Sequence, residues 1–200
     1  MDISGKLSIK LLKYITSNID KTEEEAEKIQ YGIQVILINF FKAIILFSTA
    51  LIFNVFTYTF IAVISFAFIR AFASGVHTDS SIKCIIINYI MFLGNAYLSR
   101  SITINRITAV AIVAISLISY IIYAPADTEE RPLISKKLRK ESKIKAIIVV
   151  IALGAVSILF LDDTYRNLII ISILEGAVII TPFVYWVFGK SYRNYEKVEL

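Results

Sequence analysis

Long apolar runs separated by short polar segments dominate the pattern of this 200-residue chain. Runs of this kind match the roughly 20 residues that a helix needs to cross the hydrocarbon core of a bilayer. We therefore predict an all-α, polytopic helical membrane protein with about six transmembrane helices, at 31–53, 57–72, 85–98, 107–124, 146–161 and 167–188. The second and third runs are short for a crossing, which indicates tilt, added flanking residues or a partly re-entrant path.

The first 29 residues differ from the runs that follow. Between residues 3 and 19, apolar positions recur near the helical period, and lysines lie off that stripe. This pattern predicts an amphipathic helix on the membrane surface, although packing against other protein explains it equally well. A second helix start follows in DKTEEEAEKIQ, where Asp20 or Thr22 can cap a helix that continues into the first crossing.

The distribution of Lys and Arg predicts the orientation. With both termini in the cytoplasm, five of these residues precede the first run, two lie in 70–84, seven in 131–145 and three after the last run. In this orientation only Arg100, Arg106 and Arg166 lie on the outer side of the membrane, and Lys42 lies within an apolar run. This asymmetry favours a single integral-membrane domain over 1–200 with a basic cytoplasmic loop at 125–145. The net charge of +5 then reports topology, so nucleic-acid binding is not implied.

Composition narrows the class further. The chain is 57% hydrophobic with a mean hydropathy of +0.72, which excludes an ordinary soluble domain. It contains one Cys and one His, too few for an internal disulfide or a structural zinc site, and no Gly-rich phosphate loop. We therefore expect neither a metal nor a cofactor.

The single His and the single Cys both lie in RAFASGVHTDSSIKC, as His77 and Cys84. A cysteine attacks as the thiolate, and a nearby histidine can take its proton and later protonate a leaving amine. In a straight helix seven residues rise about 10.5 Å, so the pair could cooperate only if the backbone turns between them. The polar residues at 78–81 favour such a turn. The alternative is an inert packing cysteine and a solvated histidine.

At these residues the chain resembles the accessory gene regulator B (AgrB) family. The pattern R-x-F-A-x-G-x-H, six residues and then C looks like that family's active-site region, and YAPADTEERPL with the lysines after it resembles its cytoplasmic loop. The resemblance implies a membrane-embedded cysteine endopeptidase of Gram-positive quorum sensing in the bacterial cell membrane. It also implies that the partner is an AgrD-like precursor peptide. Membrane lipid is a further expected partner, and a homodimer is a family-level expectation.

The resemblance implies roles for individual residues. Cys84 is the nucleophile and His77 the general base, and Arg70 and Gly75 match as supporting residues. Cleavage near the precursor's C-terminal side would leave a thioester on Cys84, which a Cys or Ser of the peptide resolves into a thiolactone or lactone. Ser74 departs from the pattern, because the family often has a second Gly there. Asp79 and Asn88 are candidates for a third catalytic partner by proximity only.

Other polar residues leave alternatives open. Lys42 and Glu175 lie within predicted crossings and either pair or reach water separately. The basic run with Lys136, Lys137, Arg139 and Lys140 either reports topology and attraction to anionic lipid or binds acidic residues of the precursor. For the whole chain, the alternatives to a peptidase are a small peptide transporter or channel, or a scaffold in which Cys84 is merely buried or acylated.

Overall fold

The computed structural model describes residues 23–76, 81–129 and 132–198. Packing divides the chain into two units, Met1–Thr49 and Ala50–Leu200, and each is described by itself. The prediction of an all-α fold is confirmed, because the described residues form helices and one isolated β-bridge. The predicted amphipathic helix at 3–19 lies outside the described residues.

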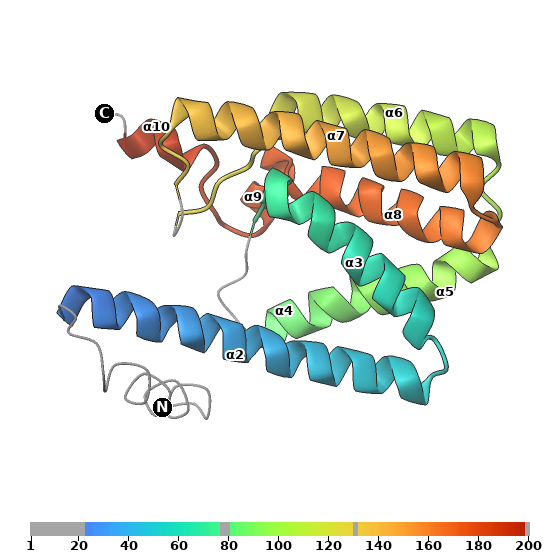
Figure 1. Cartoon of the computed structure of the whole chain (residues 1–200), viewed down its shortest axis with the longest axis horizontal. Coiled ribbons are helices and arrows are strands. Elements are labelled where there is room, and N and C mark those ends of the chain that lie inside the picture. The colour runs from blue at the N-terminus through green and yellow to red at the C-terminus, as the bar shows by residue number, and fades with distance from the viewer. Residues whose placement is uncertain (1–22, 77–80, 130–131, 199–200) are drawn as a thin grey trace. The chain divides into compact units, whose positions relative to one another are not determined.

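The α-helices are labelled in Figure 1. In chain order the helices are α2 (Glu23–Ile52), α3 (Phe56–Ala73), α4 (Ser81–Asn88), the π-helix η1 (Tyr89–Leu93), α5 (Gly94–Ser101), α6 (Arg106–Tyr123), α7 (Lys136–Phe160), α8 (Asp163–Ile179), α9 (Pro182–Val187) and α10 (Asn194–Val198).

Among the described residues, four helices are long and apolar enough to cross a membrane: Gly32–Ile52, Phe56–Ala73, Arg106–Tyr123 and Lys136–Phe160. The predicted crossing at 85–98 falls in α4, η1 and α5, which follow one another without a break from Ser81 to Ser101. The predicted crossing at 167–188 falls on α8, which has 17 residues, and on the short α9. The four long helices support a multi-pass membrane protein, and the other two crossings remain predictions.

The part of α2 that belongs to the first unit is apolar and largely exposed. Ile36 is 68% exposed and Phe40 is 60% exposed, and both lie in the segment long enough to cross a membrane. Large exposed apolar side chains over such a length indicate contact with lipid rather than with water.

Side-chain caps explain where three helices begin. The side chains of Asn105, Ser135 and Asp162 each accept a hydrogen bond from the backbone N–H three residues later, at the starts of α6, α7 and α8. Such caps satisfy N–H groups that have no partner within the helix, and each contributes roughly 1 kcal/mol.

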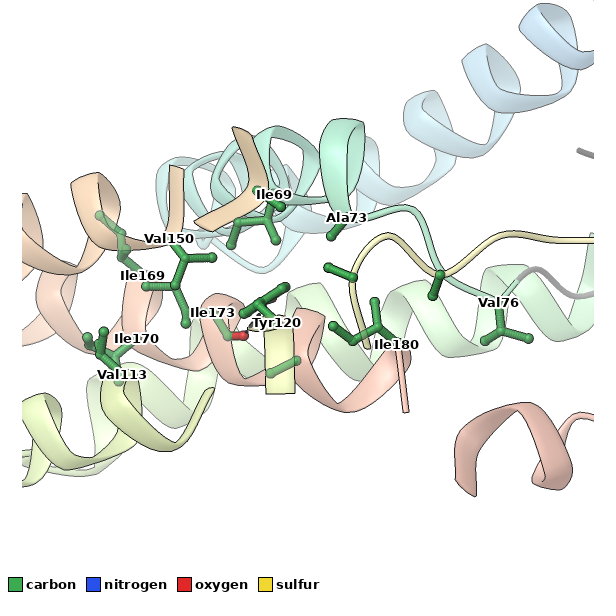
Figure 2. Packing of buried hydrophobic residues seen from close by; sticks show 14 of the residues in the cluster. Ile69, Ala73, Val76, Val113, Tyr120, Val150, Ile169, Ile170, Ile173 and Ile180 are labelled. Carbon is green, nitrogen blue, oxygen red and sulfur yellow. Dashed lines mark hydrogen bonds between the residues drawn. The ribbon is translucent and has the colours of Figure 1, made fainter. Parts of the chain in front are cut away.

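Helix α8 is the central element of the second unit and packs against α3, α5, α6 and α7. Figure 2 shows the core cluster, which includes Ile69, Tyr120, Val150 and Ile173. The Tyr120 hydroxyl donates a hydrogen bond of 3.0 Å to the Ile173 carbonyl oxygen. Gly176 leaves room for this hydroxyl, because a Cβ at Gly176 would collide with it.

Buried amides join α5 to α8. Asn95 Nδ2 donates to the Leu168 carbonyl oxygen at 3.2 Å and to Ser172 Oγ at 3.1 Å. Asn167 Nδ2 donates to the Ser99 and Ile102 carbonyl oxygens at 3.1 and 2.8 Å. Since a buried polar group is costly without a partner, these bonds select one register of α8 against its neighbours.

The helix directions place the charged residues of the second unit at two ends. Residues 73–76, 124–129 and the chain after α8 meet at one end, where Gly75 bonds to Ala126 and Tyr185 bonds to Asp127. We call this the loop end. Arg70 and the basic run of α7 lie toward it. The opposite end carries Arg106 and Arg166, and Arg166 Nη2 donates to the Ile104 carbonyl oxygen at 2.7 Å.

Candidate active site

Arg70 holds the chain that leaves α3. It lies in the last turn of α3, and its Nη2 donates to the carbonyl oxygens of Val76 at 2.6 Å and Gly75 at 3.3 Å. Its guanidinium carbon also lies 5.8 Å from the centroid of the Phe66 ring. Because one planar guanidinium contacts two successive carbonyls, it sets the course of the backbone immediately before His77.

The residues after α3 also pair with the distant loop that follows α6. The Ala126 N–H donates to the Ala73 carbonyl oxygen at 2.9 Å, and the Gly75 N–H donates to the Ala126 carbonyl oxygen at 2.8 Å. Ser74 and Ala126 thus form a parallel β-bridge. The bridge links the predicted catalytic segment to the loop whose sequence also resembles the family.

Both the backbone conformation at Gly75 and the atoms around it favour glycine there. Its φ of +128° is a conformation that L side chains rarely adopt. A Cβ there would lie 3.0 Å from Ile179 Cγ2 and 3.1 Å from Arg70 Nη1. A side chain would therefore press on the guanidinium that holds the segment.

Ser74 carries a conformation that glycine adopts more readily, with φ at 58° and ψ at −140°. We predict that Ser74→Gly raises the free energy of unfolding by about 1 kcal/mol, because removing the Cβ relieves more strain than the added freedom of the unfolded chain costs. Thermal unfolding of the purified protein in detergent measures this change. An unchanged or lower unfolding temperature would contradict the expected relief of strain.

Cys84 is the fourth residue of α4 and is half-buried. The Asn88 Nδ2 group lies 3.9 Å from Cys84 Sγ as a hydrogen-bond donor, and Arg70 lies within electrostatic range of the same thiol. The Cys84 thiol therefore lies in the first turn of a helix, beside an amide donor and in range of a cation. The structure thus brings together Cys84, Asn88 and Arg70 from the residues that the sequence singled out.

His77 and Asp79 lie outside the described residues, as do residues 78–80 of the turn predicted at 78–81. The described residues on either side are not helical at 75 and 76 and are helical from Ser81. The separation of His77 from Cys84, and the roles of both, therefore stay predictions. Among the described residues, no group of three or more His, Cys, Asp and Glu side chains could hold a metal ion.

Sequence reasoning did not single out Asp127, which organises the loop end. Its carboxylate is buried and accepts backbone N–H groups from Tyr195 at 2.8 Å, Asn194 at 3.0 Å and Leu133 at 3.3 Å. The Tyr185 hydroxyl donates to the Asp127 carbonyl oxygen at 2.7 Å. An Asp within a turn-rich stretch was the available signal, but two of its partners, Asn194 and Tyr195, lie more than sixty residues away.

Glu129 makes a second link in the same loop. Its Oε1 accepts from the Ser191 backbone N–H at 2.9 Å and from Ser191 Oγ at 2.8 Å. These hydrogen bonds favour the ionised carboxylate and lower the pKa of Glu129 below its usual value.

Comparison with known proteins decides the family. The model of the family described as accessory gene regulator B matches residues 8–183. The chain belongs to the AgrB family. The resemblance predicted from the Arg70–Cys84 region is therefore confirmed.

Similarity to individual AgrB relatives extends over nearly the whole chain. A putative AgrB-like protein of Clostridium acetobutylicum is 32% identical, over 98% of this chain and 97% of that protein. One from Listeria innocua is 32% identical, over 88% and 87% of the respective chains. The accessory gene regulator protein B of Staphylococcus saprophyticus is 29% identical, over 88% of this chain and 97% of its own. No solved structure shows a significant match.

The basic run of this AgrB-family chain divides into two groups. Arg139 Nη1 donates to the carbonyl oxygens of Leu133 at 2.7 Å and Ile134 at 2.9 Å, and its guanidinium carbon lies 3.9 Å from the centroid of the Tyr195 ring. Lys136, Lys137 and Lys140 are exposed. Arg139 therefore supports the loop, whereas the three lysines are accessible to a ligand.

The predicted pair of Lys42 and Glu175 spans the two units. Lys42 belongs to the first and Glu175 to the second, so their pairing stays a prediction. Glu175 is half-buried on α8. Its Oε2 has no hydrogen-bond partner among the described residues.

Proposed function

We propose that this protein is a membrane-embedded cysteine endopeptidase that cleaves the C-terminal part of an AgrD-like precursor peptide. Membership of the AgrB family, a family of cysteine endopeptidases, is the observation that carries the proposal. The surroundings of Cys84 support it, because the thiol lies in the first turn of α4 beside the Asn88 amide and in range of Arg70. Peptide transport without proteolysis is the alternative.

In the proposed reaction, the Cys84 thiolate attacks the scissile carbonyl carbon after His77 takes the thiol proton. The C–N bond breaks, and His77 returns the proton to the departing amine. The N-terminal part of the precursor remains as a thioester on Cys84. An internal Cys or Ser of the peptide then attacks the thioester, which closes a thiolactone or lactone ring and releases the Cys84 thiol.

Arg70 and Gly75 act in this proposal as positioning residues. Arg70 holds the carbonyls of the two residues before His77, and Gly75 allows the backbone to pass close to that guanidinium. The bridge to Ala126 anchors the same segment from the other side. A histidine that directly follows a segment held by these hydrogen bonds is expected to have fewer orientations to search, which raises the fraction of productive geometries.

We further infer six crossings with both termini in the cytoplasm of a bacterial cell. The unbroken helical run Ser81–Ser101 supports the third crossing, and α8 with α9 supports the sixth. The gathering of Arg70 and the basic run toward the loop end supports a cytoplasmic site. That compartment is reducing, so Cys84 would persist as a thiol. A site at the edge of a membrane bundle also limits hydrolysis of the thioester.

A covalent intermediate tests the proposal directly. With a precursor whose internal nucleophile is replaced by Ala, cyclisation cannot occur, and we expect the N-terminal fragment to accumulate on Cys84 as an adduct that hydroxylamine removes. Mass spectrometry of the full-length protein in proteoliposomes measures the added mass and its position. Precursor that is cleaved or exported with no mass added to Cys84 would exclude this mechanism and favour the transporter.

A further inference from the structure

A basic pocket at the loop end is not used by the proposed chemistry. It has a volume of about 310 Å³ and is formed by the end of α6, the loop after it, α7, the segment before α10 and the start of α10. Its lining includes four cationic side chains: Arg139, Lys140, Lys143 and Arg193.

The charge of this pocket is strongly unbalanced. Asp127 is the one carboxylate in its lining, and that carboxylate accepts three backbone N–H groups from Leu133, Asn194 and Tyr195. Arg193 also forms an exposed ion pair with Glu196 at 3.3 Å, whereas Lys140 and Lys143 lie one helical turn apart on α7. An anion that enters the pocket therefore meets at least two lysines whose charge the pocket lining does not neutralise.

Aromatic side chains line this pocket and lie exposed near it. Tyr123, Tyr192 and Tyr195 line it, and the rings of Tyr123 and Tyr192 lie 6.4 Å apart between centroids. At the same end, on α9, Phe183 is 67% exposed and Trp186 is 76% exposed. Exposed Trp and pocket-lining Tyr at the end of apolar helices are typical of the headgroup region of a bilayer.

We propose that this pocket binds the phosphate of an anionic phospholipid headgroup. Lys140 and Lys143 would contact the phosphate oxygens, and the tyrosine rings would lie along the glycerol and upper acyl region. Basic pockets between membrane helices bind lipid headgroups through this chemistry. The proposal is independent of the peptidase reaction, because no residue of the predicted catalytic pair takes part.

The loop that lines the pocket also contacts the predicted catalytic segment. Ala126 lies in the pocket lining, and its backbone pairs with Ala73 and Gly75. A bound headgroup that restrains 124–127 therefore also restrains the segment that Arg70 holds. We expect the lipid to stabilise this arrangement by mass action.

The test is a titration of the detergent-purified full-length protein with dioctanoyl phosphatidylglycerol, followed by native mass spectrometry. Replacing Lys140 and Lys143 by Ala should weaken binding about 10- to 30-fold. The matched control replaces Lys136 and Lys137 by Ala, because these lysines lie on the same helix outside the pocket and remove the same charge. We expect the control to bind within about twofold of the wild type. Dioctanoylglycerol, which lacks phosphate, should not bind at this site.

Several outcomes would overturn the proposal. Equal loss in both double variants would show attraction to charge alone, and equal binding of dioctanoylglycerol would show an apolar site. Binding of inorganic phosphate as tight as that of phosphatidylglycerol would assign the pocket to a soluble anion. An acidic precursor peptide that depends on Lys140 and Lys143, with no lipid bound there, would assign it to precursor docking. Circular dichroism and size-exclusion chromatography would establish that each variant is folded.

Discussion

Cleavage of the precursor should fall by at least about 10³-fold when Cys84 is replaced by Ala, because no other cysteine exists in the chain to form the acyl intermediate. His77→Ala should cause a similar loss, since an uncharged methyl group can neither take the thiol proton nor protonate the leaving amine. Epitope-tagged precursor co-expressed with each variant, followed by electrophoresis of the products, measures the cleaved fraction.

The amount of each variant in the membrane shows whether cleavage is lost because a catalytic group is missing or because the protein does not fold. Cys84 is half-buried and bonds through its side chain only weakly, at 3.9 Å to Asn88, so its removal should leave the level of protein in the membrane unchanged. Asn88→Ala serves as the neighbouring control and should retain cleavage at a reduced rate, because the amide contacts the thiol at 3.9 Å but neither forms the acyl intermediate nor transfers a proton. Cleavage by either the Cys84 or the His77 variant at wild-type rate would rule out the assignment of the pair.

Gly75→Ala should lower the free energy of unfolding by about 2 kcal/mol, and it should reduce cleavage by at least about tenfold. An alanine at φ +128° is strained, and its Cβ would press on Ile179 and on the Arg70 guanidinium. Displacing that guanidinium loosens the carbonyls of residues 75 and 76 and hence the approach to His77. Thermal unfolding in detergent and the single-turnover cleavage rate measure the two effects.

Gly94→Ala is the matched control for this substitution. Gly94 has helical backbone angles, and a Cβ there would meet no heavy atom within 4 Å. We expect an unchanged or slightly higher stability and an unchanged cleavage rate, because alanine is the better helix former. If the Gly75 and Gly94 variants behaved alike, the special role of residue 75 would be refuted.

The membrane-spanning character was predictable because hydropathy is a local property. Each of the four long apolar helices corresponds to a run found from the sequence, with ends that differ by only a few residues except at the start of α7. The sequence placed that start near 146, whereas α7 begins at Lys136 and carries the basic run within its first turns. Because charged residues are compatible with a helix, hydropathy predicts the boundary of the apolar, membrane-spanning part and does not predict the first residue of the helix.

The candidate site was predictable in part. His77 and Cys84 are the single His and the single Cys of the chain, and they lie in a recognisable pattern. These two facts identified them as the candidate catalytic pair without any coordinates. The Asn88 amide near Cys84 Sγ follows from helical spacing, since residues four apart share a face. The hydrogen bonds from Arg70 to two backbone carbonyl oxygens could not be predicted, because every residue has a carbonyl and the sequence does not show which one a side chain will contact.

By itself, the sequence determined the helical membrane class, the family and the residues to test, because hydropathy, charge asymmetry and a short motif are all written locally along the chain. Only the tertiary structure decided what surrounds those residues: the pairing of Gly75 with Ala126, the burial of Asp127 and the basic pocket beside it. Each of these joins segments that are about fifty or more residues apart. Such contacts arise when packed helices bring loops that are distant in sequence to the same end of the helix bundle. Local sequence patterns do not predict which of these loops will be in contact.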